Sequence, residues 1–192
     1  MPHGPDGIDP EAGGRETRTF EGQTFEGQAF EKRVMALLPD LRRYARSLSA
    51  SDADGEDLLQ DGVERLLTAR ATWTGTNFRA WAMTILTNLY RNGTRRERRF
   101  PSVELDAAAE LPSAPAEGDP LERARLQRAL DRLSPDFRAT LMLVVVEGHS
   151  YAEVAAITHA PIGTVMSRLS RARAELARHL EQDNIVPLRR SE

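Results

Sequence analysis

Arginine is the residue type in this chain whose spacing most clearly suggests chemistry. Four arginines fall within the run RRERR at 95–99, and Arg168, Arg171 and Arg173 follow one another along a later segment. Guanidinium groups bind phosphates and the edges of bases, and they stay charged at physiological pH. These two groups of arginines therefore predict two separate surfaces that bind a polyanion.

Residues 151–180 are predicted to form two helices at a tight turn, with Pro161 and Gly163 in the break. Apolar residues recur along the second helix at four- and three-residue steps and give it one buried side: Val165, Leu169, Ala172, Leu176 and Leu180. The opposite side carries Thr164, Met166, Ser167, Arg168, Ser170, Arg171 and Arg173. This pattern is typical of a helix-turn-helix whose second helix enters a major groove. The alternative is an amphipathic hairpin whose arginines are merely solvated.

A second surface for nucleic acid is predicted around residues 73–99. Its aromatic residues are Trp73, Phe78, Trp81 and Tyr90. Aromatic rings stack on unpaired bases, while neighbouring arginines hold the backbone of the strand. The helical spacing of Phe78 and Trp81 favours core packing for these two rings. We therefore expect the outward contacts to come from Asn88, Arg91 and the run at 95–99.

The sequence offers little for catalysis or metal binding. Its four histidines are scattered, with no spacing suited to a metal site or to a nucleophile and base: His3, His149, His159 and His179. Asp57 and Asp61 share a helical face, but they lie near a helix N-terminus, where the helix dipole favours negative charge. No glycine-rich phosphate loop is present. We predict that the chain is not an enzyme and has no metal site, cofactor or small-molecule substrate.

The net charge of −3 conceals strong local blocks of charge. Residues 79–99 contain six arginines and one acid, whereas residues 101–122 contain six acids and no base. The sequence of 192 residues has no cysteine, which predicts a reducing, cytoplasmic compartment. No apolar run approaches the roughly 20 residues that span a bilayer, so we expect no membrane insertion.

Helices are the only elements that the apolar spacing predicts. In addition to the hairpin, they cover 30–48, 52–69, 77–99, 120–133 and 135–147. Ser51 or Asp52 is expected to cap the second of them, and Ser134 to cap the last, with Pro135 in its first position.

Composition then divides the chain into parts. The expected parts are a disordered tail (1–28), a first domain (29–99), a linker (100–119), a second domain (120–182) and a tail (183–192). The fold class is therefore all-α. Two small helical domains are joined by a flexible acidic linker rich in Pro and Ala, and the second domain contains the helix-turn-helix.

Three segments, in this order, resemble the extracytoplasmic-function group of bacterial sigma factors: DGEDLLQD (54–61), FRAWAMTILTNLYRN (78–92) and YAEVAAITHAPIGTVMSRLSRARAEL (151–176). The resemblance covers about residues 30–182. It implies that the first domain binds core RNA polymerase and the melted minus-ten strand of promoter DNA. It implies that the second domain binds the minus-thirty-five element as duplex, and that an anti-sigma factor is a further partner.

The resemblance also assigns roles to three sets of residues. The helix that docks on core polymerase would use Asp57, Leu58, Gln60, Asp61 and Glu64. Contacts with the minus-ten strand would come from Asn88, Arg91, Asn92, Arg95 and Arg96. The recognition helix at the minus-thirty-five element would use Thr164, Met166, Ser167, Arg168, Arg171 and Arg173. Two positions depart from the family: Met166 replaces a usual lysine or arginine, and Asn92 replaces a common aspartate.

The segment LPDLRRYARSL (38–48) is similar to the alphaproteobacterial general-stress sigma factors, which implies a stress response. It is also similar to the sigma-like domain of their response regulator, which sequesters an anti-sigma factor. A decoy that works by protein mimicry is therefore the alternative function, although the run at 95–99 and the recognition-helix arginines count against it. A simple helix-turn-helix repressor would leave residues 30–99 without a purpose.

Overall fold

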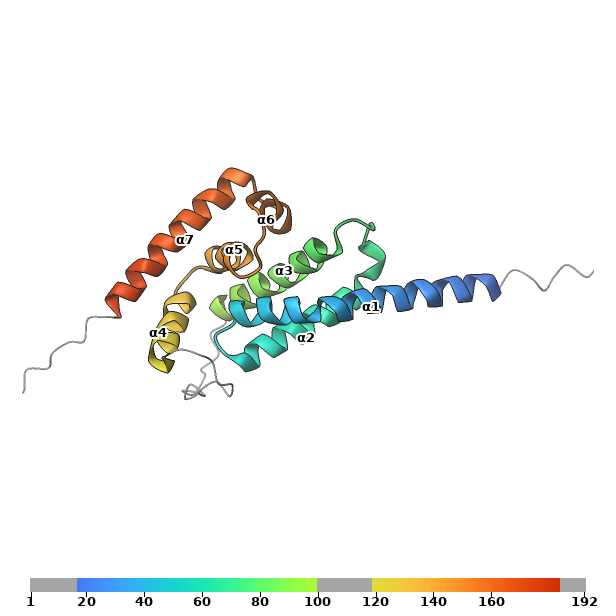
Figure 1. Ribbon diagram of the computed structural model, residues 1–192, viewed down its shortest axis with the longest axis horizontal. Helices are drawn as coiled ribbons and strands as arrows, with labels where there is room; N and C mark the ends of the chain where they lie inside the picture. Colours follow the sequence, from blue (N-terminus) through green and yellow to red (C-terminus); the bar gives the residue numbers. More distant parts are fainter. Residues whose placement is uncertain (1–16, 100–118, 184–192) are drawn as a thin grey trace, which may run out of the picture. The chain divides into compact units, whose positions relative to one another are not determined.

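The structure is a computed structural model that describes the backbone of residues 17–99 and 119–183, and the side chains of 29–95 and 119–183. These residues form helices only, which confirms the all-α prediction (Figure 1). The elements are α1 (Thr17–Leu48), α2 (Asp52–Thr68), a 3-10 turn η1 (Arg70–Thr72), α3 (Phe78–Arg99), α4 (Pro120–Asp131), α5 (Pro135–Val145), α6 (Tyr151–Thr158) and α7 (Ile162–Gln182).

The chain divides after Ala36 into two units, Met1–Ala36 and Leu37–Glu192, and α1 runs through the division. The helix begins at Thr17, so the predicted start of the first helix at residue 30 is wrong. Extending a helix that already exists costs much less than nucleating one, and the Glu and Gln residues in this stretch favour helix. Residues 1–16 of the predicted tail, the linker at 100–118 and residues 184–192 lie outside the described residues.

Residues 37–99 build a core from the second half of α1 together with α2 and α3. Its fully buried side chains include Leu41, Tyr44, Leu66, Met83 and Leu86. The α2 helix packs closely because it presents glycines to its neighbours. A Cβ at Gly55 would lie 3.0 Å from the Cα of Arg46 on α1, and one at Gly62 would lie 2.6 Å from a methyl of Leu86 on α3. The expected cap of α2 is present, since Ser51 accepts a hydrogen bond from the backbone of Asp54.

Residues 119–183 build a second set of packed helices. Ser134 caps α5 with Pro135 in the first turn, as predicted. Ser150 caps α6 through a reciprocal pair of hydrogen bonds with Glu153. The hydrogen bonds that the Glu153 carboxylate accepts from the backbone N–H and the hydroxyl of Ser150 lower the pKa of that carboxyl. The buried stripe expected on the last helix is present, with Val165, Leu169 and Ala172 inside.

The turn between α6 and α7 differs from the prediction. His159 adopts the left-handed conformation, with φ of 50°, and ends α6. Pro161 then precedes the first residue of α7, and Gly163 lies within the first turn of that helix, not in the break. The sequence predicted the turn at Pro161 and Gly163, but the residue with the left-handed backbone conformation that ends α6 is His159.

The two sets of helices contact each other within the unit Leu37–Glu192. The α3 helix packs against α5 and α6. Arg138 on α5 is 3% exposed and donates hydrogen bonds to the carbonyls of Ser47 and Ser49, at 3.0 and 2.7 Å. A buried guanidinium needs such partners, so this contact fixes α5 against the end of α1. Among the described helices, none is both long enough and apolar enough to cross a bilayer.

Candidate nucleic-acid interface

The predicted recognition helix, α7, presents a polar side to solvent. Ser167, Arg171 and Arg173 are exposed, and so is Met166, whose surface is 53% accessible. Ile162 lies one turn before Met166 and is 50% accessible, so the two form an exposed apolar pair. The helix therefore offers hydroxyl, guanidinium and apolar contacts together, which is the mixture that reads base edges in a major groove.

Two predicted members of this surface are less accessible than expected. Thr164 is partly buried, and the side chain of Arg168 is only 24% exposed. Arg168 turns toward α5, where its Nη2 atom lies 2.9 Å from Oδ2 of Asp136. Its charge is therefore already paired within the chain.

The predicted minus-ten residues lie along one side of α3. Asn88, Asn92 and Arg95 are exposed, at positions that share a helical face. The side chain of Arg91 is 18% exposed, and its Nε atom lies 2.7 Å from Oδ1 of Asp136. Arg96 lies on α3, but its side chain is outside the described set.

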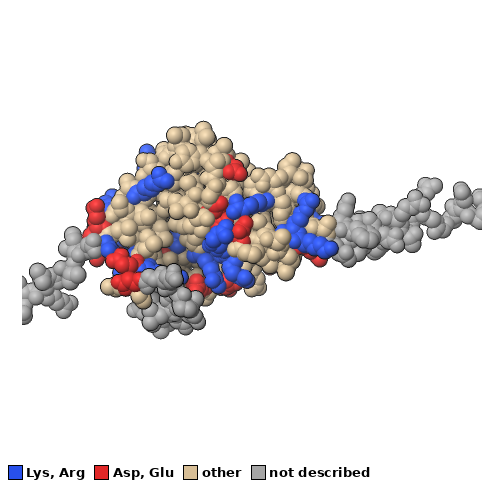
Figure 2. Space-filling view, in the orientation of Figure 1, with Lys and Arg blue, Asp and Glu red and all other residues tan. Residues whose placement is uncertain are grey.

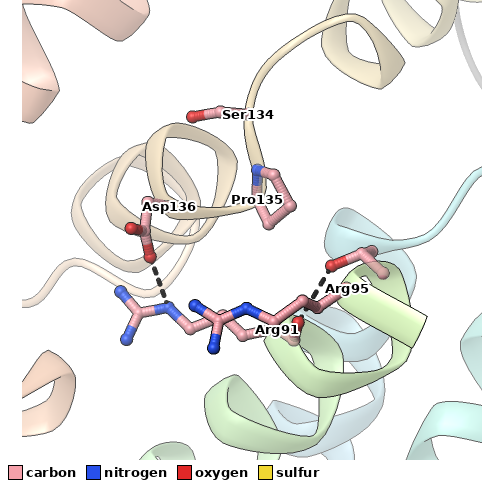
Figure 3. Close-up of a pocket in the computed structure, with 6 residues that line it drawn as sticks. Arg91, Arg95, Ser134, Pro135 and Asp136 are labelled. Carbon is pink, nitrogen blue, oxygen red and sulfur yellow. Dashed lines mark hydrogen bonds and ion pairs between the residues drawn. The ribbon is translucent and has the colours of Figure 1, made fainter. Parts of the chain in front are cut away.

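Arg91 and Asp136 line a pocket of about 240 Å³ between α3 and the start of α5. Figure 3 shows Arg91 and Arg95 on α3 near Ser134, Pro135 and Asp136 of the α5 segment, with the Arg91–Asp136 ion pair drawn as a dashed line. The Nη1 atom of Arg91 also donates to the carbonyl of Thr158 on α6, at 3.5 Å. The pocket is therefore basic on one wall and carries one carboxylate on the other.

The aromatic residues before and within α3 form a partly buried cluster. The ring centroids of Trp73 and Phe78 lie 5.4 Å apart in an edge-to-face arrangement, and those of Phe78 and Trp81 lie 5.7 Å apart. Phe78 and Trp81 pack against the core, as their helical spacing predicted. The Trp73 indole donates to the carbonyl of Thr76 and so ties the loop before α3 to this cluster.

The predicted polymerase-docking residues share one exposed side of α2. Asp57, Gln60, Asp61 and Glu64 are exposed, and Leu58 is partly buried. In the part of the chain that the structure describes, the three carboxylates form no ion pair within 4.0 Å, whereas Glu56 pairs with Arg42 and Arg46. This side of α2 therefore carries uncompensated negative charge that suits a basic partner.

An ion-pair network around the buried Glu147 joins α1, α3 and the segment after α5, and it was not predicted from the sequence. The fully buried carboxylate of Glu147 lies 2.8 Å from Nη2 of both Arg43 and Arg79. Glu147 raises the pKa of the Arg43 guanidinium. His149 completes the group, because its Nε2 atom lies 3.0 Å from Nη1 of Arg79. Burial, and then the charge of Arg79, lower the pKa of His149.

Asp136 and Glu147 are the residues that sequence reasoning missed. Their positions beside distant arginines depend on tertiary packing, and no local pattern marks them. Figure 2 shows basic and acidic side chains next to each other at several places on the described face. In the described residues, no group of three or more His, Asp or Glu side chains has the arrangement of a metal site.

Two family models match the chain. Sigma-70 region 2 matches residues 33–100, and sigma-70 region 4 matches residues 123–176. The ECF RNA polymerase sigma factor EcfG of Rhodopseudomonas palustris is 38% identical over 152 residues, which cover 78% of this chain and 84% of EcfG.

Solved structures show the same relationship. The sigma factor RpoE of Bartonella quintana, in complex with the anti-sigma factor NepR, aligns with a TM-score of 0.65 and 33% identity over 82% of this chain and 99% of RpoE. CnrH, in complex with the cytosolic domain of CnrY, aligns with a TM-score of 0.59 and 28% identity over 82% of this chain and 90% of CnrH. The chain therefore belongs to the extracytoplasmic-function group of RNA polymerase sigma factors.

Proposed function

We propose that this transcription initiation factor divides promoter recognition between two helical faces. As a sigma factor it directs RNA polymerase to promoters. Residues 29–99 would bind core polymerase and the melted minus-ten strand, and residues 120–182 would bind the minus-thirty-five duplex. Residues 100–119 would link the two domains. The observation that carries this proposal is that α3 and α7 each present an exposed row of hydrogen-bonding and basic side chains.

At the minus-thirty-five element, α7 would enter the major groove with the side opposite its core contacts. Arg171 and Ser167 lie on that side and are exposed. Arginine forms a bidentate contact with guanine, and serine accepts or donates at any base. Arg173, Arg168 and Thr164 would contribute flanking contacts with phosphates or bases, and Met166 an apolar one.

At the minus-ten element, Asn88, Asn92 and Arg95 would contact unpaired bases and backbone, with Arg91 and Arg96 beside them. Capture of unstacked bases stabilises the melted strand without chemistry by the protein. We propose accordingly that the chain itself catalyses no reaction. Because phosphate contacts release counterions, binding should weaken steeply as salt rises.

The exposed acidic side of α2 is proposed to dock on core polymerase. Asp57, Asp61 and Glu64 supply charge, Gln60 supplies hydrogen bonds, and Leu58 supplies a small apolar contact. An anti-sigma factor is a further proposed partner, since RpoE, which resembles this chain, binds the anti-sigma factor NepR. We place the chain in the cytoplasm, with the polymerase, and in a stress response.

Reconstituted transcription tests the proposal. The chain is mixed with core polymerase, and initiation is measured on a promoter selected from a randomised library. Arg171→Ala should weaken the free energy of binding to the minus-thirty-five duplex by about 1–3 kcal/mol, the usual contribution of a base-reading arginine, and should lower the rate of initiation accordingly. Arg178→Ala is the matched control, because Arg178 is exposed on the same helix two turns further along. Equal effects of the two variants would refute the assigned reading face, and a folded chain that never initiates would refute the function.

A further inference from the structure

One carboxylate contacts arginines from both of the helices that the proposed function assigns to DNA. Asp136 lies 2.7 Å from Arg91 of α3 through Oδ1 and 2.9 Å from Arg168 of α7 through Oδ2. A carboxylate that bridges two guanidiniums reproduces the charge and the acceptor arrangement of a DNA phosphate. We propose that Asp136 is an intramolecular phosphate mimic, which holds the two DNA-binding faces together until nucleic acid displaces it.

The position of Asp136 is fixed by contacts on either side of it. The buried Glu147 pairs with Arg43 and Arg79, and Arg138 binds the carbonyls at the end of α1. Both contacts join the helices of residues 37–99 to those of 119–183. Separating the two sets of helices would break both ion pairs of Glu147, with Arg43 and with Arg79. These contacts therefore favour the closed arrangement that brings Asp136 between Arg91 and Arg168.

Asp136 differs from Glu147 in that it can be displaced. Its side chain is 43% exposed, so an anion from solvent can reach the same arginines. Two guanidiniums also exceed one carboxylate in charge. The Nε and Nη2 atoms of Arg91 are buried and have no hydrogen-bond partner among the described residues; Nε meets Asp136 as an ion pair only. The exposed Arg95 lines the same pocket. A phosphate would therefore gain contacts that Asp136 does not fill.

This proposal rests on the proposed function, because it assumes that Arg91 and Arg168 contact DNA. If only a fraction of the chains is open, the apparent association constant for DNA equals that of the open form multiplied by the open fraction. Removing the mimic should raise that fraction. The proposal thus predicts a variant that binds DNA more tightly although it has lost no positive charge and gained none.

The test measures the separation of the two sets of helices in the full chain. Because the sequence contains no cysteine, Leu67→Cys on α2 and Leu121→Cys on α4 give two specific sites for spin labels or dyes at exposed positions. Asp136→Asn should add a population with a longer distance. It should also raise the affinity for a duplex selected against the wild type by roughly threefold or more.

Asp183→Asn is the matched control. It makes the same charge change, but Asp183 pairs with Arg128 of α4 and with Arg132, the residue that follows α4, and these contacts stay within residues 119–183. Its distance distribution and affinity should match those of the wild type, with binding compared at equal ionic strength. If Asp136→Asn behaves as the control does, the proposal is overturned.

A measurement on the labelled chain without the Asp136 change covers the case in which Asp136→Asn does not fold. Inorganic phosphate should increase the long-distance population more than sodium chloride at the same ionic strength, and an equal response to both salts would overturn the proposal. Transcription by the unlabelled wild type separates the two claims. A chain that opens with phosphate but never directs initiation refutes the proposed function, whereas a chain that initiates but shows no phosphate response refutes only the mimic.

Discussion

The arginines of α7 differ in what they must give up to bind DNA. Arg171 and Arg173 are exposed, whereas Arg168 is 24% exposed and paired with Asp136. An exposed guanidinium loses mainly conformational entropy when it meets a base or phosphate. A paired guanidinium must also lose its ion pair. We therefore expect Arg171 to contribute more to net DNA affinity than Arg168, although the sequence pattern predicts both on the same polar side of the helix.

Met166 provides a prediction at the same scale. Its side chain is exposed beside Ile162, at a position where the family usually has a cation. We expect it to contact the C5-methyl of a thymine, because apolar side chains read that group in the major groove. Met166→Ala should weaken binding to the selected minus-thirty-five duplex by about 1 kcal/mol, the value of roughly one buried methylene.

Replacing thymine by uracil in that duplex tests the contact directly, because uracil lacks only the methyl group. Wild type should lose affinity at one thymine position, and Met166→Ala should show no further loss there. If uracil weakens both proteins equally, or neither, Met166 does not read a thymine.

At the scale of elements, local signals predicted helix starts well. Ser51 and Ser134 were expected as caps, and both accept the capping hydrogen bond. Capping depends on neighbouring residues alone, so a single sequence carries the information. The start of α1 was missed because residues 17–28, which lack an apolar repeat, precede the packed part of that helix. The turn at His159 was missed because a glycine and a proline lie close by. In both cases the helix boundary could not be predicted from the neighbouring residue types alone.

Packing of α1 on α3 depends in part on one buried hydrogen bond. The hydroxyl of Tyr44 lies 2.9 Å from that of Thr87, which donates its own hydrogen to the carbonyl of Met83 at 2.7 Å. Tyr44 must therefore be the donor. Burial raises the pKa of Tyr44 well above its usual value, so this donor stays protonated. Tyr44→Phe should lower the free energy of unfolding by about 1 kcal/mol, measured by urea denaturation.

Tyr151→Phe is the control for this substitution. Tyr151 is 37% exposed, so the same loss of a hydroxyl should change the free energy of unfolding by less than about 0.5 kcal/mol. A Tyr44→Phe variant as stable as the control would show that the buried bond adds nothing to the packing of the two helices.

At the scale of the whole molecule, the sequence predicted which residues lie on which helix but not which charges meet. Helical periodicity places Arg91 on α3 and Arg168 on α7, because it needs only the spacing of apolar neighbours. The pairing of both with Asp136 needs the packing of three helices. For the same reason, neither the net charge nor the charge blocks of the sequence indicate that the buried Glu147 pairs with Arg43 and Arg79.

The pH dependence of stability follows from His149. Burial and Arg79 lower its pKa, and Glu147 and Glu153 oppose this more weakly. The unfolded chain then takes up a proton at His149 at a higher pH than the folded chain does. The free energy of unfolding is therefore expected to fall as the pH drops through about 6.5, by at most about 1.4 kcal/mol per pH unit for one proton.

Urea denaturation at pH 7.5 and 5.5 checks this expectation. His149→Gln, which stays neutral, should lose less stability between the two pH values than the wild type. Carboxylates titrate in both proteins, so the difference between them isolates the histidine. An identical loss in the two proteins would show that His149 does not link protonation to folding.

The most direct measurement of the central claim is permanganate reactivity of promoter thymines, because permanganate oxidises unpaired thymine. Core polymerase with this chain should expose thymines at the minus-ten element of a selected promoter, and core polymerase alone should not. Asn88→Ala with Arg95→Ala should reduce this reactivity while binding to an isolated minus-thirty-five duplex stays unchanged. The account would be contradicted if the complete holoenzyme bound the promoter and left every minus-ten thymine unreactive.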